Sequence, residues 1–438
     1  MIHPRIWTRR DFLKATGIGI LGLTTGCAPN PVTGESQFML VSEEQEISMD
    51  RQQSPHQFSA DYGATQDAHL NRYVNDVGLS LAGKSHRPNM PYSFRCLNAV
   101  YVNAYAFPGG SIALTRAIML ELDNEAELAA LLGHEIGHVN ARHTAARMSK
   151  SQVTSLVVGL GTAVAGAVND AAGSLAAGLG NFGTGAFLAR YSREDERQAD
   201  DLGMNYMMRA GYDTEGMVGL MDMLNKQHEE KPGALELMFA THPMSSERLA
   251  TARNAAAGKY ATSGEYRLYR ERYMDNTVSL RRMGPAIREM QKGSTLMGTK
   301  NYAQAAERYE IALGTAPDDY AGLLLLAKCR LVQKNYADAA RRAEKAMAVY
   351  PTEPQALQVA GIAQLGTENY SRALDHFTAY EQKLPGNPNT VFYKGLALEK
   401  LGNREESARE YYRFLQSVTQ GDQARYAYTR LKEWGYVK

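Results

Sequence analysis

The chain has 438 residues, and at about 150 residues per domain this length predicts about three domains. Lys and Arg number 48 against 47 Asp and Glu, and the net charge of +1 argues against a nucleic-acid binder, which needs a basic excess. No unbroken apolar run reaches about 18 residues, which excludes a polytopic membrane protein, and three cysteines are too few for a disulfide scaffold. Composition therefore predicts a soluble protein of several domains.

Residues 1–26 are predicted to be an export signal. Basic residues precede a short apolar run at 15–25 that glycines interrupt, as in a signal peptide. The pair Arg9-Arg10, followed by Asp-Phe-Leu-Lys, resembles a twin-arginine signal, which exports folded cargo. An ordinary secretion signal is the alternative.

The three cysteines are predicted to play two different roles. The stretch Leu23-Thr24-Thr25-Gly26-Cys27 resembles a lipoprotein processing site, with Thr24 at the position usually held by leucine. Cys27 is therefore the predicted lipidation site and membrane anchor. Cys96 and Cys329 are predicted to be buried free thiols rather than a disulfide.

The segment 151–190 is rich in glycine and alanine. Its apolar content is too interrupted for a membrane-spanning helix. A mobile or membrane-skimming loop and a packed helical pair are the two interpretations of this segment.

The C-terminal third carries a 34-residue period. It is marked by asparagine at 301, 335, 369 and 403 and by proline at 317, 351 and 385. This period, with helical stretches that end at proline, resembles the tetratricopeptide repeat. We therefore expect residues 266–438 to form an α-solenoid of about four repeats, with Asp422–Trp434 as a capping helix. Its concave surface would hold extended peptides or partner proteins, and a rigid spacer is the alternative.

A single helix is predicted from Asn124 to Lys150, and it carries His134-Glu135-x-x-His138. Residues four apart lie on one helix face, so both imidazoles would point toward the same divalent ion. Glu135 would instead reach a water bound to that ion. His143, nine residues after His134, would lie about half a turn away and is predicted to pack near the ligands without being one.

A catalytic zinc ion needs a third protein ligand beside an open position for water. Glu196 and Asp200 are four residues apart and would project from one face of a second helix. One carboxylate would bind the metal and the other would accept a hydrogen bond from a ligating histidine.

Two strands are predicted upstream, at Tyr92–Leu97 and Val100–Phe107, before the turn at Pro108-Gly109-Gly110. A strand edge beside the metal helix would bind substrate backbone by strand addition, and an ordinary core hairpin is the alternative. The predicted substrate-binding residues are Asn103, Ala104, Tyr105 and Ala106.

These motifs, with Thr241-His242-Pro243 and Arg248, resemble in their order the HtpX-related zinc metallopeptidases. The start of the mature chain and the added repeats are similar to the BepA- and LoiP-like periplasmic lipoproteins of that family. The resemblance implies a mainly α protein: an α+β, gluzincin-like metallopeptidase domain with a small β-sheet over 27–265, then the repeats.

The family resemblance also assigns roles to individual residues. His134, His138 and Glu196 would hold one Zn2+ ion, with Glu135 as general base and Asp200 orienting a ligand. His242 would be a fourth ligand on a loop that plugs the site, an interpretation preferred over a transition-state donor. Arg248 would stabilise the oxyanion or tether that loop.

The resulting functional prediction is a zinc endopeptidase of the cell envelope. By resemblance, it would act in the periplasm, anchored to the inner face of the outer membrane. Its substrates would be misfolded or incompletely assembled outer-membrane proteins recruited by the repeats, and its partners would include their assembly machinery. The alternative is a periplasmic chaperone or assembly adaptor in which proteolysis is secondary.

Overall fold

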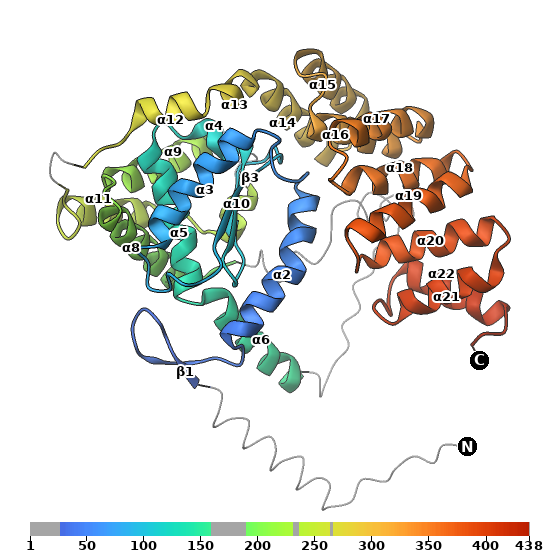
Figure 1. The fold of residues 1–438 in the computed structure, drawn as a ribbon, viewed down its shortest axis with the longest axis horizontal. Helices are drawn as coiled ribbons and strands as arrows, with labels where there is room; N and C mark the ends of the chain where they lie inside the picture. The colour runs from blue at the N-terminus through green and yellow to red at the C-terminus, as the bar shows by residue number, and fades with distance from the viewer. Residues whose placement is uncertain (1–26, 159–189, 231–235, 263–265, 438) are drawn as a thin grey trace, which may run out of the picture.

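A computed structural model describes residues 27–158, 190–230, 236–262 and 266–437 (Figure 1). The predicted export signal at 1–26 lies outside these ranges, as do the side chain of Cys27 and most of the Gly/Ala-rich segment, at 159–189. Among the described helices, none combines the length and the apolar content that crossing a bilayer requires.

The N-terminal domain, residues 27–262, holds the strands and the first helices. Its strands are β1 Cys27–Pro29, β2 Ser36–Phe38, β3 Ser93–Leu97, β4 Ala104–Ala106 and β5 Ser111–Thr115. Its helices are α2 Glu43–Ala60, α3 Ala68–Ala82, α4 Arg116–Glu121, α5 Glu125–Asn140, α6 His143–Val158, α8 Arg193–Arg209, α9 Glu215–Glu230, α10 Glu236–Thr241 and α11 Ser246–Ala257.

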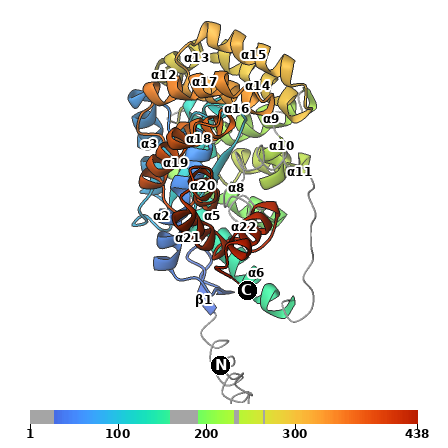
Figure 2. The same ribbon diagram turned by 90° about the vertical axis from the view of Figure 1, so that its right-hand side faces the viewer.

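Two short helices, α12 Arg270–Asn276 and α13 Val278–Arg282, lead into the repeat array of helices α14 to α22. The array consists of α14 Gly284–Gly298, α15 Tyr302–Thr315, α16 Tyr320–Val332, α17 Tyr336–Val349, α18 Gln355–Gly366, α19 Tyr370–Lys383, α20 Pro388–Lys400, α21 Arg404–Leu415 and α22 Asp422–Glu433. It curves around one side of the N-terminal domain, and the two views agree on this placement (Figures 1 and 2).

The main sheet has three strands in the order β3-β5-β4, with β3 parallel and β4 antiparallel to β5. The predicted strands at 92–97 and 100–107 are thus not paired with each other, because β5 lies between them. The second strand is also shorter than predicted and covers only Ala104–Ala106. Its position places β4 at an edge of the sheet.

Helix α5 lies at the centre of the N-terminal domain, and all of its residues are buried. Asn124 begins it by accepting a hydrogen bond from the Glu127 amide at 2.9 Å. A Cβ atom on Gly133 would lie 3.1 Å from the Gly203 carbonyl oxygen, and one on Gly137 would lie 3.0 Å from the Ala199 Cα. The two glycines therefore let α5 and α8 meet backbone to backbone, which brings residues of α8 beside the histidines of α5.

The prediction of one helix from Asn124 to Lys150 is wrong, because the chain turns between α5 and α6. Arg142 has a φ of 59°, in the left-handed region that ends helices. Its Nε donates to Glu46 Oε1 at 3.0 Å and its Nη2 to the Val41 carbonyl at 2.7 Å. These contacts stabilise the turn, and His143 therefore begins a separate helix.

The 34-residue period corresponds to helix boundaries in the repeat array. The asparagines at 301, 335, 369 and 403 are the N-caps of α15, α17, α19 and α21. The residue before each asparagine has a positive φ: Lys300, Lys334, Glu368 and Gly402. Small residues at 305, 339, 373 and 407 are fully buried where neighbouring helices meet. The period thus specifies where helices start and where they touch.

A second periodic feature is a glycine that packs under an aromatic ring of the next helix. A Cβ atom would lie 2.5 Å from the Tyr309 ring at Gly293, and 2.6 Å from the Phe377 ring at Gly361. The corresponding distance from Gly395 to the Tyr411 ring is 2.7 Å. These three pairs leave no room for a side chain at the glycine.

Candidate metal centre

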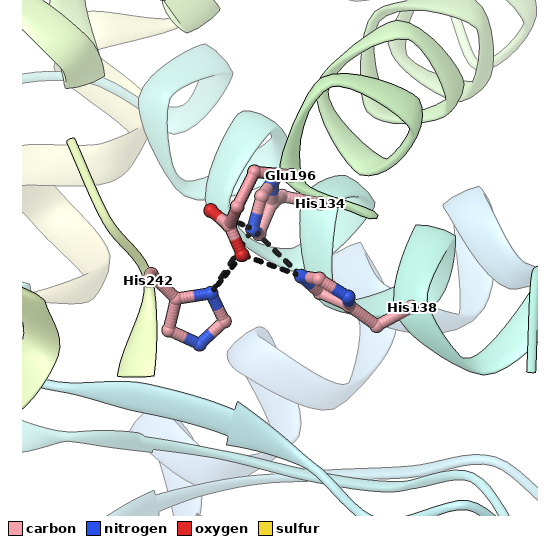
Figure 3. Close-up of side chains that lie close together, drawn as sticks. All are labelled: His134, His138, Glu196 and His242. Atoms are coloured by element: carbon pink, nitrogen blue, oxygen red, sulfur yellow. Dashed lines mark hydrogen bonds and ion pairs between the residues drawn. The ribbon is translucent and has the colours of Figure 1, made fainter. Parts of the chain in front are cut away.

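Four side chains from three segments converge in the N-terminal domain (Figure 3). His134 and His138 come from α5, Glu196 from α8, and His242 from the loop that follows α10. One potential ligand atom from each of these residues lies within 4.8 Å of the others, and all four residues are buried. Of the described residues, they form the one such group that could hold a metal ion.

The distances show how tightly these ligand atoms are gathered. His134 Nε2 lies 3.0 Å from His138 Nε2 and 3.3 Å from His242 Nδ1. Glu196 Oε1 lies 3.0 Å from His242 Nδ1 and 3.4 Å from His138 Nε2. Three imidazole nitrogens and one carboxylate oxygen form a donor set that suits zinc and related divalent metals.

The protonation states of His138 and Glu196 favour metal binding. Burial holds the pKa of His138 well below its usual value, so its imidazole is neutral. Burial opposes ionisation of Glu196, but His242 and His138 outweigh it, and its pKa lies well below the usual value. For His242, burial lowers the pKa, but Glu196 and Glu135 raise it more, which favours the protonated ring while no metal is bound. Neutral imidazole and ionised carboxylate are the forms that bind metals.

Asp200 orients His134. Its Oδ1 lies 2.9 Å from His134 Nδ1, so that nitrogen carries the proton and Nε2 is left free to face the other ligands. Arg248 donates from Nη2 and Nε to Asp200 at 2.7 and 2.8 Å. Burial would raise the pKa of Asp200, but Arg248 and His134 outweigh it and the pKa is lowered.

His138 has its own orienting contact, with His143. Their Nδ1 atoms lie 2.9 Å apart, and His143 Nε2 lies 2.9 Å from Gln198 Oε1. The His138 ring also stacks on Tyr191, with ring centroids 3.8 Å apart. His143 therefore packs beside a candidate ligand, as predicted, but from the first turn of α6 and not from the helix that carries His138.

The sequence analysis did not identify Tyr191 or Gln198. Gln198 lies two residues after Glu196 on α8, on a different helix face, so the four-residue spacing that selected Glu196 and Asp200 gives no signal for it. Tyr191 precedes the N-cap of α8 and has no local pattern that signals its stacking contact.

Glu135 has an oxygen available to accept a proton. Its Oε1 lies 3.7 Å from His242 Nε2, whereas Oε2 is buried and has no hydrogen-bond partner among the described residues. Burial raises the pKa of this carboxyl group. A buried carboxylate with a free oxygen beside the ligand cluster has the character of a general base.

The loop that carries His242 is held in place by Arg248. The Arg248 Nη1 atom donates to the Pro243 carbonyl at 3.0 Å and forms an ion pair with Glu196 Oε2 at 2.6 Å. Together with the bonds to Asp200, these contacts engage the whole guanidinium group. Of the two roles considered for Arg248, the geometry favours the tether of the loop.

The predicted substrate-binding residues Asn103–Ala106 lie on and next to β4, and all four are buried. The Thr115 amide donates to the Asn103 carbonyl at 3.0 Å, and the Phe107 amide donates to the Ser111 carbonyl at 2.8 Å. Because bonds alternate along an antiparallel ladder, the backbone groups of Ala104 and Ala106 face away from β5. No described strand pairs with that edge.

Comparison with known proteins agrees with this geometry. Residues 68–256 match peptidase family M48, and residues 290–355 and 359–424 match the tetratricopeptide repeat. The chain therefore carries a domain of peptidase family M48 followed by tetratricopeptide repeats. The predicted metallopeptidase resemblance and the predicted fold class are confirmed.

Individual relatives are similar over part of the chain. The "Beta-barrel assembly-enhancing protease" of Escherichia coli K12 is 32% identical over 193 residues, which cover 43% of this chain and 39% of the relative. The "Metalloprotease YcaL" of the same organism is 31% identical over 39% of this chain and 64% of its own. The "Metalloprotease LoiP" is 29% identical over 41% and 66%, respectively. The match to the first relative thus spans well under half of its length.

Proposed function

We propose that the protein is a zinc-dependent endopeptidase. The observation that carries the proposal is the convergence of His134, His138 and Glu196 beside Glu135, whose buried Oε2 has no partner in the described structure. Three protein ligands and a neighbouring carboxylate base are the usual complement of a catalytic zinc site.

The protein's own groups have separate tasks in this proposal. Zinc would supply Lewis acidity toward a water molecule and toward the scissile carbonyl group. Glu135 would take the proton of the attacking water at Oε2 and pass it to the leaving amine. Asp200 and His143 would hold the two histidine rings in the orientation that metal binding needs.

His242 would keep the site closed as a fourth ligand. Its Nδ1 lies 3.0 Å from Glu196, and its Nε2 lies 3.7 Å from Glu135, where a water and a substrate carbonyl would have to enter. A catalytic zinc site keeps one position open, so the loop held by Arg248 would have to move. We expect His242→Ala to cleave casein faster than the wild type. Slower cleavage at unchanged zinc content would instead indicate a transition-state role.

The proposed substrates are misfolded or incompletely assembled outer-membrane proteins, recruited by the repeats. The name of the beta-barrel assembly-enhancing relative supports this class. We propose a periplasmic location at the inner face of the outer membrane, with export by a twin-arginine-type signal and a lipid on Cys27. Assembly machinery of the outer membrane would be a partner of the repeats. An extended substrate would pair with the edge of β4.

Replacement of Glu135 tests the enzymatic proposal. We expect Glu135→Gln to retain metal, because the side chain is not a ligand, and to lose about 10³-fold in the rate of casein cleavage. A chelator should abolish wild-type cleavage. Glu127→Gln is the matched control, a buried glutamate on the same helix that caps its start. Full proteolysis by metal-loaded Glu135→Gln would contradict the mechanism.

A client-binding adaptor is the second candidate function, and the closed arrangement around His242 favours it. In that case the repeats would do the essential work and cleavage would be secondary. The same full-length Glu135→Gln variant separates the two, because it keeps the repeats intact. Full restoration of outer-membrane protein assembly in cells that lack the protein would make binding the primary function.

A further inference from the structure

The repeat array contacts the N-terminal domain at the turn that follows α2. Lys328 Nζ of α16 donates to Tyr62 Oη at 3.3 Å and lies 4.5 Å from the centre of the Tyr62 ring. Ser59 donates to the Glu353 carboxylate, and both residues are buried. A Cβ atom on Gly63 would lie 2.5 Å from Glu353 Oε2. Two repeats therefore press closely on this one turn.

The turn itself has a backbone that needs external support. Tyr62 and Gly63 both have positive φ values, 67° and 71°. For tyrosine this left-handed conformation is uncommon and persists where surrounding contacts enforce it. Lys328 from the repeats and Asn98, which donates to the Tyr62 carbonyl at 3.1 Å, supply such contacts.

The residue before Tyr62 links this turn to the edge strand. Asp61 is 4% exposed, and its two carboxylate oxygens accept from Tyr101 Oη and Tyr105 Oη, each at 2.5 Å. Gln57 adds a third bond at 2.9 Å. Tyr105 is the central residue of β4, so the strand at the edge of the sheet is bonded to the turn that the repeats hold.

Two explanations fit a buried carboxylate of this kind. It can be a static element of the core, or it can transmit the position of the repeats to the strand. Burial raises the pKa of Asp61, while the two tyrosines, Gln57 and the charge of Lys328 oppose that rise. The contact of Lys328 with the strained turn favours the second explanation.

We propose that Asp61 is a positioning residue through which the repeat array, by way of Lys328 and Tyr62, holds β4 in the place where substrate backbone pairs with it. The connection runs from α16 to Tyr62, from Asp61 to Tyr105, and from Tyr105 to the strand. Occupation of the repeats by a client protein would then change how well β4 holds a peptide. This inference rests on the proposed peptidase function.

Steady-state kinetics on a short peptide provide the first test, with the full-length metal-loaded protein. We expect Tyr105→Phe and Lys328→Met each to raise KM about fivefold and to leave kcat within about twofold, because binding is affected and the chemistry is not. Tyr411→Phe is the matched control, since it removes a tyrosine hydroxyl that donates to Glu399 at 2.7 Å in a distant repeat. An unchanged KM in Lys328→Met would overturn the proposal.

Amide hydrogen exchange provides a test that needs no proteolysis. We expect Lys328→Met to accelerate exchange about tenfold in a fragment that covers β4 and to leave α11 unchanged, since Lys328 acts through Tyr62 and Asp61, and the side chain of Asp61 is bonded to Tyr105 of β4 and to no residue of α11. If the wild-type protein fails to cleave the peptide but Lys328→Met still accelerates exchange in β4, the peptidase proposal is rejected and the coupling between the repeats and β4 is supported. Equal exchange of β4 in wild type and Lys328→Met would reject the coupling.

Discussion

The contacts that organise the metal centre of the N-terminal domain join residues much further apart in sequence than those that organise the repeat array. In the repeats, each helix packs on its neighbours, and the same contacts return every 34 residues. In the metal centre, His134 meets His242 at 3.3 Å across 108 residues of sequence. The repeats are therefore specified by local pattern, whereas the site depends on the whole domain being folded.

This difference predicts different consequences of substitution. A solenoid has a stability that is roughly a sum over repeats and their interfaces, so a defect in one repeat stays there. A convergent site has no such independence, because each ligand is oriented by contacts from another segment. Substitutions in the two regions test this contrast.

Removal of His143 should weaken the metal centre although His143 is not a proposed ligand. Its Nδ1 atom fixes the ring of His138, and loss of such an orienting contact lowers metal affinity by about 10- to 100-fold. The measurement is competition for zinc by a chelator with full-length His143→Ala. His86→Ala is the control, an exposed histidine bonded to Tyr206 instead. Equal zinc affinity in wild type and His143→Ala would show that the contact from His143 is not needed to orient the ring of His138.

A defect in one repeat should remain local. Gly361→Ala places a Cβ atom 2.6 Å from the Phe377 ring, and such overpacking costs about 1–2 kcal/mol in the free energy of unfolding of the array. Gly314→Ala is the control, because nothing lies within 4 Å of its Cβ position; in a helix the change stabilises by about 0.5 kcal/mol. Urea unfolding of Gly361→Ala, Gly314→Ala and the wild type measures both changes in the free energy of unfolding.

The same Gly361→Ala variant tests the contrast between the two regions. Zinc binding by the N-terminal domain should be unaffected, because Gly361 lies on α18 and its close contact is within the array. A loss of zinc affinity in this variant would mean that the repeats and the metal centre do not behave as separate units.

The sequence predicted the repeat array from its 34-residue period, and it predicted the last helix, Asp422–Trp434, which is α22, Asp422–Glu433. It also predicted the shared face of His134 and His138, because both lie within one unbroken helix, α5. Periodicity is a property of nearby residues, and both features depend on nearby residues alone.

The features that the sequence did not predict depend on distant contacts. The helix break at Arg142 relies on Glu46, which lies 96 residues earlier. The pattern of nearby residues therefore predicts α5 and α6 as one helix. The predicted packing of His143 near the ligands is confirmed, but His143 reaches His138 from a separate helix. The residues alone also left Glu196 and Asp200 equivalent as ligands. Only the packing of α8 on α5 places Glu196 among the histidines and Asp200 behind His134.

The smallest effect is predicted for an ion cluster inside the repeats, and it depends on pH. Asp338 Oδ1 accepts from Arg341 at 2.9 Å, and its Oδ2 accepts from Arg330 at 3.0 Å. Burial would raise the pKa of Asp338, but Arg342, Arg341 and Arg330 outweigh it, and the pKa is lowered. A carboxyl group whose pKa is lowered by folding stabilises the protein above its unfolded pKa, and this stabilisation is lost as the pH falls through the folded value.

We therefore expect Asp338→Asn to lower the free energy of unfolding of the array by about 1 kcal/mol at pH 7, since partial exposure of the arginines weakens each pair. The difference from wild type should shrink below about pH 4, where the wild-type carboxyl group takes up its proton. Asp422→Asn, in an exposed pair with Arg425, should change the stability by less than about 0.5 kcal/mol at either pH. Urea unfolding at pH 7 and pH 3 measures both variants. A deficit in Asp338→Asn that stays constant between these two pH values would mean that the amide disturbs packing and that the charge of Asp338 contributes nothing, so that the repeats would depend on shape alone.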